Sequence, residues 1–136
     1  MLKIILSILK SQAEKIIAEE QAGFRAERRT TEQIFNLRNL FEKYLQHQED
    51  RSHVFIDFKK ARDRVWHVAL WATMKKYNIS VNLIRVIKNF YEKATSAVFF
   101  NGSIGDWFRK TIGVRQGCLL SPTLFNIFLE RTMTYA

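Results

Sequence analysis

The positions of apolar residues along this chain predict a largely helical protein. Four segments repeat apolar side chains at the spacing of one helix face: residues 2–20, 30–48, 67–78 and 81–94. Residues 119–136 read as a further helix, with Ser121 as the expected N-cap and Pro122 in the first helical position. Thr30 or Thr31 is the expected N-cap of the helix that follows them.

Two other segments have the composition of strands. His53 to Phe58 is an apolar, β-prone run, and residues 96–113 carry Asn101-Gly102 between apolar runs, which is a hairpin signal. The sequence "VRQGC" after the hairpin reads as a loop. Because strands and helices do not alternate regularly, we expect an α+β fold in which helices cover one side of an antiparallel sheet.

Asp57 lies inside the first strand-like run, next to Lys59 and Lys60. Burying an unpaired carboxylate costs several kcal/mol, so its position needs a reason. Either the pleat of the strand turns Asp57 to water, or Asp57 is a metal ligand at the end of a strand that lines a cleft. The segment alone leaves both interpretations open.

Composition narrows the classes of function. A length of 136 residues suits one compact unit, and a hydrophobic content of 47% allows a core. The 22 Lys and Arg residues exceed the 13 Asp and Glu residues, giving a net charge of +9. Such an excess favours nucleic acid as a partner, or less specifically an anionic membrane surface, although it can also serve solubility alone.

Several other features exclude alternatives. Cys118 is the single cysteine, so the chain can form neither an internal disulfide framework nor a cysteine-based zinc site. The histidines His47, His53 and His67 lack metal-ligand spacing and are expected at the surface. The apolar start "MLKIILSILK" is too short to span a bilayer and no cleavage site follows it, so we expect an intracellular protein without a membrane segment.

Three stretches carry a family resemblance: "EEQAGFRAERRTTEQ", "FIDFKKARDRVWH" and "GVRQGCLLSPTLFNIFLE". In this order and spacing they resemble the fingers and palm blocks of reverse transcriptases from non-LTR retrotransposons, and the resemblance covers about Leu2 to Glu130. It implies an RNA-directed DNA polymerase that adds deoxynucleotides to a DNA primer on an RNA template by two-metal phosphoryl transfer. The chain would be part of a right-hand polymerase, with residues 1–50 mainly fingers and residues 51–136 mainly palm.

The resemblance also implies roles for individual residues. Asp57 matches the catalytic aspartate that ends the first palm strand and binds Mg²⁺, a hard cation that prefers carboxylate and phosphate oxygens. Gln116 matches a glutamine near the nascent base pair, and Gly117 lets the backbone approach the nucleotide or template. Arg25 and Arg28 match the fingers block, where guanidinium groups could bind phosphates. Without the resemblance, the loop is a tight turn before a capped helix and the arginines a solvated basic loop.

Other chemically conspicuous residues have plainer interpretations. Asp63 resembles a second catalytic acid, but the helix-like stretch that it opens favours an N-cap. Cys118 is expected to be a small packed residue. Trp66, Trp71 and Trp107 are expected in the core or at domain contacts, with base stacking as the alternative.

Two positions depart from the family pattern. Five residues after Asp57, where the family has an aromatic residue beneath the nucleotide sugar, this chain has Arg62. A long cation cannot supply a flat apolar floor, and it could pair with Asp57 or intrude on the pocket. In the fingers block, Glu27-Arg28-Arg29 replaces the usual Gly-Arg-Ser, and Glu27 loses the conformational freedom of glycine.

The family's later aromatic-x-Asp-Asp motif and its thumb do not occur before the chain ends at "ERTMTYA", and a block expected ahead of Met1 is missing. A single family-matched carboxylate should not hold two Mg²⁺ ions. We therefore expect a partial reverse transcriptase domain, from a degenerate transposable element or an incomplete gene model, that is inactive alone. The alternatives are a non-catalytic basic module that binds nucleic acid, and a retrotransposon relic without function.

Overall fold

The computed structural model describes residues 1–47 and 52–134. The chain divides into two compact units. The larger unit comprises Met1–Ile17 and Lys60–Ala136, and the smaller unit comprises Ala18–Lys59.

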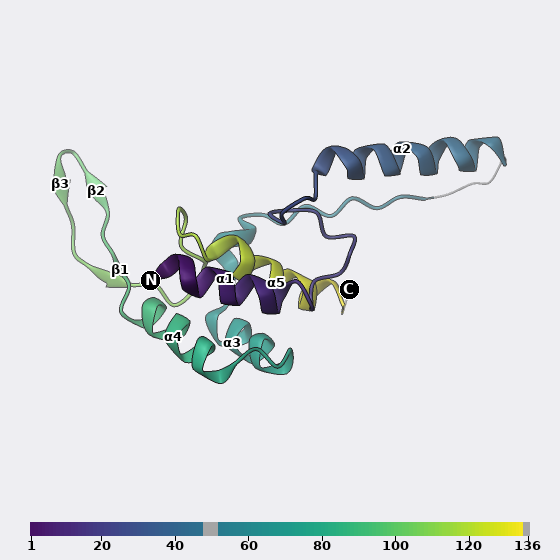
Figure 1. The fold of residues 1–136 in the computed structure, drawn as a ribbon. Coiled ribbons are helices and arrows are strands. Elements are labelled where there is room, and N and C mark those ends of the chain that lie inside the picture. Colours follow the sequence, from purple (N-terminus) through teal and green to yellow (C-terminus); the bar gives the residue numbers. More distant parts are fainter. Residues whose placement is uncertain (48–51, 135–136) are drawn as a thin grey trace. The chain divides into compact units, whose positions relative to one another are not determined.

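The larger unit contains most of the helices, and Figure 1 shows their order along the chain. Its helices are α1 (Leu2–Ala13), the short 3₁₀ helix η1 (Ala61–Arg64), α3 (His67–Lys76), α4 (Val81–Glu92) and α5 (Ser121–Met133). Its strands are β1 (Thr95–Ser96), β2 (Phe99–Phe100), β3 (Ser103–Ile104) and β4 (Phe108–Arg109). This mixture of helices and small antiparallel sheets agrees with the expected α+β class.

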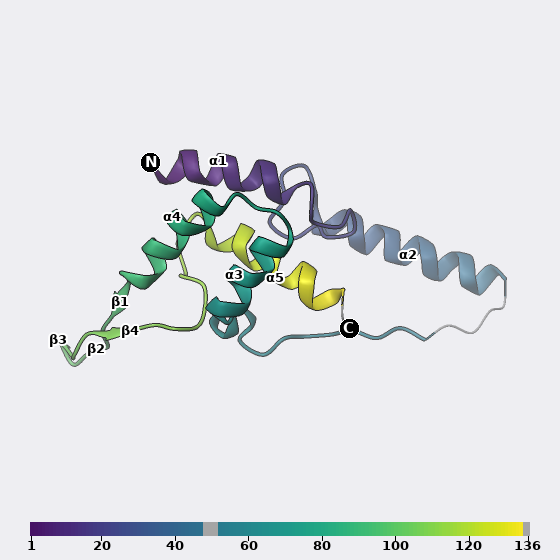
Figure 2. The same cartoon turned by 90° about the horizontal axis from the view of Figure 1, so that it is seen from below.

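The core of the larger unit lies among its helices. Helix α5 packs against both α1 and α3, and α4 packs against α3 (Figure 2). Each helix contributes apolar residues spaced three or four apart, which places them on one face. Fully buried side chains in this core include Leu9, Leu70, Met74, Ile87, Leu124 and Ile127. The first helix thus packs on this core through Leu9.

The predicted hairpin is present. Strands β2 and β3 pair antiparallel, and the turn between them places both Asn101 and Gly102 at positive φ, as a tight two-residue turn requires. Strands β1 and β4 extend the pairing, with Thr95 opposite Arg109. In the described part of the chain, however, β2, β3 and β4 are exposed, so the expectation of a helix-covered sheet is wrong there. These two-residue ladders offer too little surface for a helix to cover.

Three helix starts or ends differ from the predictions. Helix α1 ends at Ala13, because the chain turns before Ile16 and Ile17. The N-cap of α2 is Arg29 rather than a threonine, and its backbone N–H donates to Glu32 Oε2 at 3.5 Å. The N-cap of α5 is Leu120 rather than Ser121.

The smaller unit contains α2 (Thr30–Gln46) and the segment that follows it. The predicted apolar stripe of α2 is present in the sequence, but no residue of this helix is buried within the described structure. The predicted strand from His53 to Phe58 is wrong, because this segment pairs with no other strand in the described ranges. Near its start the rings of His53 and of Phe41 in α2 have centroids 4.2 Å apart, and Phe55 is 79% exposed.

The three tryptophans differ in how far they are buried. Trp71 is 9% exposed and belongs to the core, as predicted, whereas Trp66 and Trp107 are exposed and lie outside the core, so a domain contact or base stacking at these two stays a prediction. Among the described helices, none combines the length and the apolar character needed to cross a membrane.

Candidate functional site

The loop that carries Gln116 and Gly117 is anchored by a pairing between two distant segments. Residues 62–67 lie against residues 112–114, and we call this pairing the clasp. The Val114 N–H donates to the Arg62 carbonyl at 2.8 Å, and the Gly113 N–H donates to the Val65 carbonyl at 2.7 Å. Trp66 and Ile112 form an antiparallel bridge next to the second of these bonds. The clasp therefore fixes the chain immediately before the loop.

His67 adds a side-chain bond to the clasp. Its Nε2 lies 2.8 Å from the Gly113 carbonyl oxygen, which can only accept, so Nε2 carries the hydrogen. His67 is half-buried rather than at the surface, and its ring also contacts Tyr91 edge-on with centroids 5.1 Å apart. The expectation that all three histidines are surface residues is thus wrong for His67, which serves the loop structurally.

Gly113 permits the two segments of the clasp to approach this closely. Its φ is +85°, and a Cβ atom at this position would lie 2.9 Å from the Asp63 carbonyl oxygen. Real Cβ contacts are not that short, so another residue would force the backbone apart. Sequence reasoning did not assign this role to Gly113, although the glycine that opens "GVRQGC" was part of the motif.

Gln116 is bonded to the other side of the clasp. Its Nε2 donates to Asp63 Oδ1 at 3.2 Å, while the side chain as a whole stays exposed. Asp63 was predicted as an N-cap, and that prediction is wrong, because Lys60 caps η1 and Trp66 caps α3. Asp63 lies inside η1, and its carboxylate is turned toward the Gln116 amide instead.

The far side of the loop is tied to the start of α5. The Ser121 hydroxyl donates to the Arg115 carbonyl, and the Ser121 N–H donates to the Cys118 carbonyl at 3.1 Å. Ser121 is the first residue of the helix rather than its cap, and its side chain is bonded to the loop. Cys118 is half-buried against the core, which confirms the prediction of a packed residue. Gly117 has a φ of +79° with open space around its Cβ position, so its conformation alone favours glycine.

Tyr91 lies beneath this end of the loop. Its hydroxyl is buried and has no hydrogen-bond partner of ordinary geometry among the described residues. Burial raises the pKa of Tyr91 above its usual value, and the nearby Ser121 side chain and the backbone of Arg115 oppose this rise without cancelling it.

Asp57 belongs to the smaller unit, whereas Arg62, Gln116 and Gly117 belong to the larger one. Asp57 is exposed and lies in the unpaired segment after α2. Whether Asp57 and Gln116 act at one nucleotide, as their family-matched roles imply, therefore stays a prediction. Across the described ranges, no three His, Cys, Asp or Glu side chains come together in a group able to hold a metal ion.

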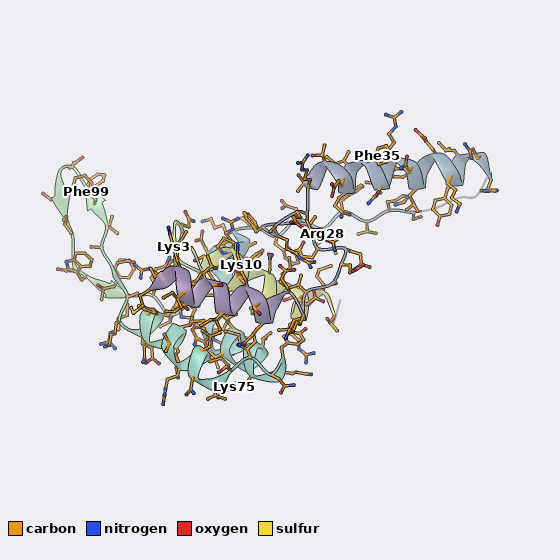
Figure 3. The ribbon with its side chains drawn as sticks, in the orientation of Figure 1. Lys3, Lys10, Arg28, Phe35, Lys75 and Phe99 are labelled. Atoms are coloured by element: carbon orange, nitrogen blue, oxygen red, sulfur yellow. The ribbon has the colours of Figure 1, made fainter. Side chains whose placement is uncertain are left out.

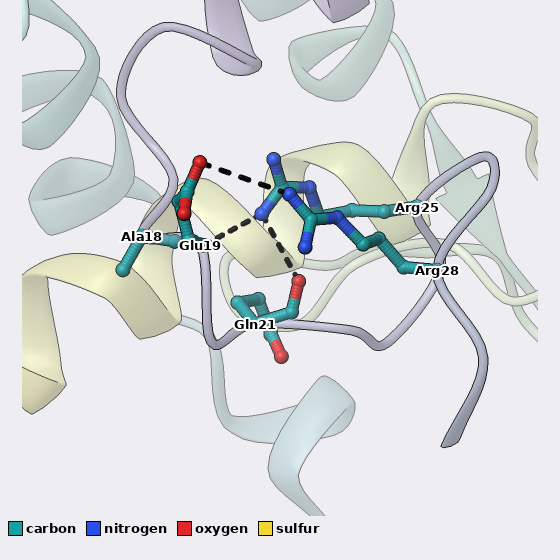
Figure 4. Close-up of polar contacts among 5 residues, drawn as sticks. All are labelled: Ala18, Glu19, Gln21, Arg25 and Arg28. Atoms are coloured by element: carbon teal, nitrogen blue, oxygen red, sulfur yellow. Dashed lines mark hydrogen bonds and ion pairs between the residues drawn. The ribbon is translucent and has the colours of Figure 1, made fainter. Parts of the chain in front are cut away.

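The fingers-block arginines have different surroundings within the smaller unit (Figure 4). Arg25 is half-buried, and its Nη1 donates to the backbone carbonyls of Ala18 at 2.6 Å and Gln21 at 3.1 Å. Arg28 is more open, and its Nη2 lies 4.0 Å from Glu19 Oε1. A surface ion pair at this distance contributes about 1 kcal/mol or less. Arg25 thus shapes the loop, while Arg28 keeps its cation near water.

Glu27 takes up the conformation that glycine prefers. Its φ is +61°, which is left-handed and unfavourable for a residue with a Cβ atom. Glu27 stands where the family pattern has glycine, and its backbone has a conformation that glycine adopts without strain.

Comparisons with known proteins agree on one family. A family model described as reverse transcriptase (RNA-dependent DNA polymerase) matches residues 1–134. The RNA-directed DNA polymerase from mobile element jockey of Drosophila funebris is 33% identical over 93% of this chain and 14% of its own length. The Drosophila melanogaster jockey polymerase is 32% identical over 89% of this chain.

A third relative is the probable RNA-directed DNA polymerase from transposon X-element of Drosophila melanogaster, which is 31% identical over 91% of this chain and 13% of its own length. The chain thus spans about one seventh of the curated relatives that it matches.

Proposed function

This chain belongs to the reverse transcriptase (RNA-dependent DNA polymerase) family, and we propose that it supplies the fingers and palm segment of an RNA-directed DNA polymerase. In this role it helps to add deoxynucleotides to a DNA primer on an RNA template. Residues 1–50 contribute mainly to the fingers and residues 51–136 mainly to the palm. The segment by itself is not an active polymerase.

The observation that carries this proposal is the support of the Gln116–Gly117 loop. A group that positions a nucleotide must be held within a fraction of an ångström by its own neighbours. The Gln116 amide is held by Asp63, and the chain on either side is fixed by the clasp and by Ser121. An exposed amide with such support suits a residue that faces a nascent base pair, as its family-matched position implies.

Arg25 and Arg28 have different roles in the fingers loop. Arg25 uses its guanidinium on backbone carbonyls, so it maintains the shape of the loop. Arg28 has 39% of its side chain exposed and only a distant carboxylate neighbour, so it is the better candidate to bind a phosphate of the template or triphosphate.

Members of this family use divalent metal ions. Two Mg²⁺ ions need several carboxylate oxygens, and the described residues bring no group of three acidic or imidazole side chains together. The donor set of the described residues therefore does not fit the metal pair by itself. Asp57 supplies one candidate carboxylate, and further carboxylates from outside this segment would have to complete the site.

Arg62 occupies the position beneath the nucleotide sugar, and its backbone carbonyl is bonded to Val114. The clasp thus fixes the backbone of this position to the segment that leads into the loop. A cation here, in place of a flat ring, should weaken the selection of deoxynucleotides against ribonucleotides.

A chimaera tests the proposal. Residues 1–134 would replace the matching segment of a jockey-type polymerase, and primer extension on an RNA template would be measured with Mg²⁺. We expect extension by the chimaera and its loss in Asp57→Ala, while Asp106→Ala, an exposed acid on the hairpin, serves as the matched control. An inactive chimaera beside an active parent, or full activity in Asp57→Ala, would refute the proposal. The isolated chain should show no extension.

A second candidate function is nucleic-acid binding without catalysis. The net charge of +9 favours it, because cations that neutralise phosphates release counterions and give sequence-independent affinity. Binding by the isolated chain together with an inactive chimaera would support this second candidate.

A further inference from the structure

We propose that an open groove between α3, α4 and residues 109–111 binds the phosphodiester backbone of a single-stranded nucleic acid. None of the residues assigned above to the polymerase site lines this groove. The lining includes His67 of the clasp but none of Asp57, Arg28, Gln116 and Gly117, so each proposal can be tested with variants of its own residues.

The groove has a cationic rim. Its volume is about 700 Å³, which is within the usual range for ligand sites. Four basic side chains from different elements line it, namely Lys75 of α3, Lys88 of α4, Arg109 of β4 and Lys110. Glu92 is the one carboxylate in the lining, and it lies 3.5 Å from the Lys88 ammonium. The remaining cations make the groove attractive to an anion.

The rim is held by the core of the larger unit. Helices α3 and α4 pack against each other, and β4 is joined to β1, which follows α4 closely in the chain. Figure 3 shows Lys75 at the outer edge of this helix pair, away from α1. All four basic side chains are exposed, and Lys88 is the one that lies beside Glu92.

The floor of the groove is formed by two aromatic rings that are almost fully buried. Trp71 and Tyr91 meet edge to face with ring centroids 5.6 Å apart, and they are 9% and 4% exposed. Rings buried to this degree cannot stack with bases, so the groove lacks the usual means of reading them. Recognition must then come from the phosphates, and binding should not depend on base sequence.

An extended strand fits this groove better than a free nucleotide does. The cations lie on a rim that is open to water, and open basic grooves track a backbone through successive phosphates. A free nucleotide would instead need an enclosed pocket with polar groups for its base and sugar, and the polar side chains of this lining lie mostly on the exposed rim.

The test uses the full 136-residue chain and a matched pair of double variants. Lys75→Gln with Lys110→Gln removes two charges from the groove, and Lys3→Gln with Lys10→Gln removes two exposed charges from α1 (Figure 3). Fluorescence anisotropy would follow the binding of labelled oligo-dT and oligo-U of about 12 nucleotides. Circular dichroism would check that both variants keep the helical content of the parent chain.

We expect the groove variant to lower the slope of log affinity against log salt by about 1.4, because each phosphate contact contributes about 0.7. The α1 variant should leave the slope nearly unchanged, and oligo-dT and oligo-U should behave alike. Equal losses in both variants would show a diffuse charge effect and overturn the proposal, as would no binding by the parent chain. Competition by free dTTP as strong as by the oligonucleotide would also overturn it, since the site would then take single nucleotides.

Discussion

Gln116 and Asp63 lie 53 residues apart in the chain and are joined by a hydrogen bond of 3.2 Å from Nε2 to Oδ1. This bond links the loop before α5 to the segment that directly follows the candidate metal-binding aspartate. Asp63 acts through Gln116, so we regard it as a positioning residue for the proposed nucleotide site.

Replacing Asp63 should therefore impair the chimaeric polymerase without removing its chemistry. Asp63→Ala leaves the Gln116 amide without its acceptor, and the loss of one such bond corresponds to about a fivefold to tenfold fall in kcat/KM for the incoming nucleotide. Asp63→Asn keeps an acceptor oxygen and should restore most of the activity. An Asn variant as impaired as the Ala variant would contradict a role through this bond.

Gly113 offers a test of the clasp. In Gly113→Ala the new Cβ would meet the Asp63 carbonyl at 2.9 Å in a left-handed backbone, so we expect a loss of about 1–3 kcal/mol in the free energy of unfolding. Gly102→Ala is the matched control, because its φ is similar but nothing lies within 4 Å of the added atom. Urea unfolding followed by tryptophan fluorescence measures both. Equal losses would mean that the close approach costs nothing beyond the backbone strain.

Replacing Glu27 with glycine should stabilise the loop that contains it. Its left-handed conformation costs about 1 kcal/mol that glycine would not incur, so Glu27→Gly should slow hydrogen exchange in residues 18–29. Glu20→Gly is the control, because Glu20 is also exposed in a turn but does not have positive φ, and there glycine should speed exchange. Faster exchange in Glu27→Gly would contradict the assigned strain.

The raised pKa of Tyr91 predicts that the stability of the protein falls at alkaline pH. Because burial raises its pKa in the folded state, both states hold the proton below the ordinary value of 10.0, and stability is unaffected there. As pH rises from that value toward the folded-state pKa, the unfolded state loses its proton first and the free energy of unfolding falls. Tyr91→Phe should reduce this fall, while Tyr77→Phe, at the end of α3, should keep it. The free energy of unfolding would be measured with urea at several pH values. If Tyr91→Phe shows the same fall as the parent chain, Tyr91 is not responsible for it.

Local signals in the sequence predicted the parts of this fold that depend on neighbouring residues. Helices α3 and α4 follow from their apolar spacing, and the hairpin follows from Asn101-Gly102, since each pattern acts within a few residues. The run from His53 to Phe58 has equally strong strand propensity, but a strand also needs a partner, and propensity says nothing about whether one is present.

In the candidate site, too, the sequence predicted local features but not the contacts between distant residues. The motif identified Gln116 and Gly117, but it could not identify the bond from Gln116 to Asp63, because no periodicity links residues so far apart. The need for glycine at position 113 likewise arises from a carbonyl on another segment. Contacts of this kind are properties of the assembled fold rather than of any window of sequence.

The clasp also bears on the order in which the protein folds. Helices α3 and α4 and the hairpin lie between its two segments, so the clasp closes a long loop of chain, and that closure costs entropy before any bond forms. Contacts between distant residues tend to form late for this reason. We therefore expect the Gln116 loop to take its shape only after the helices have assembled, and during synthesis only once Val114 has left the ribosome.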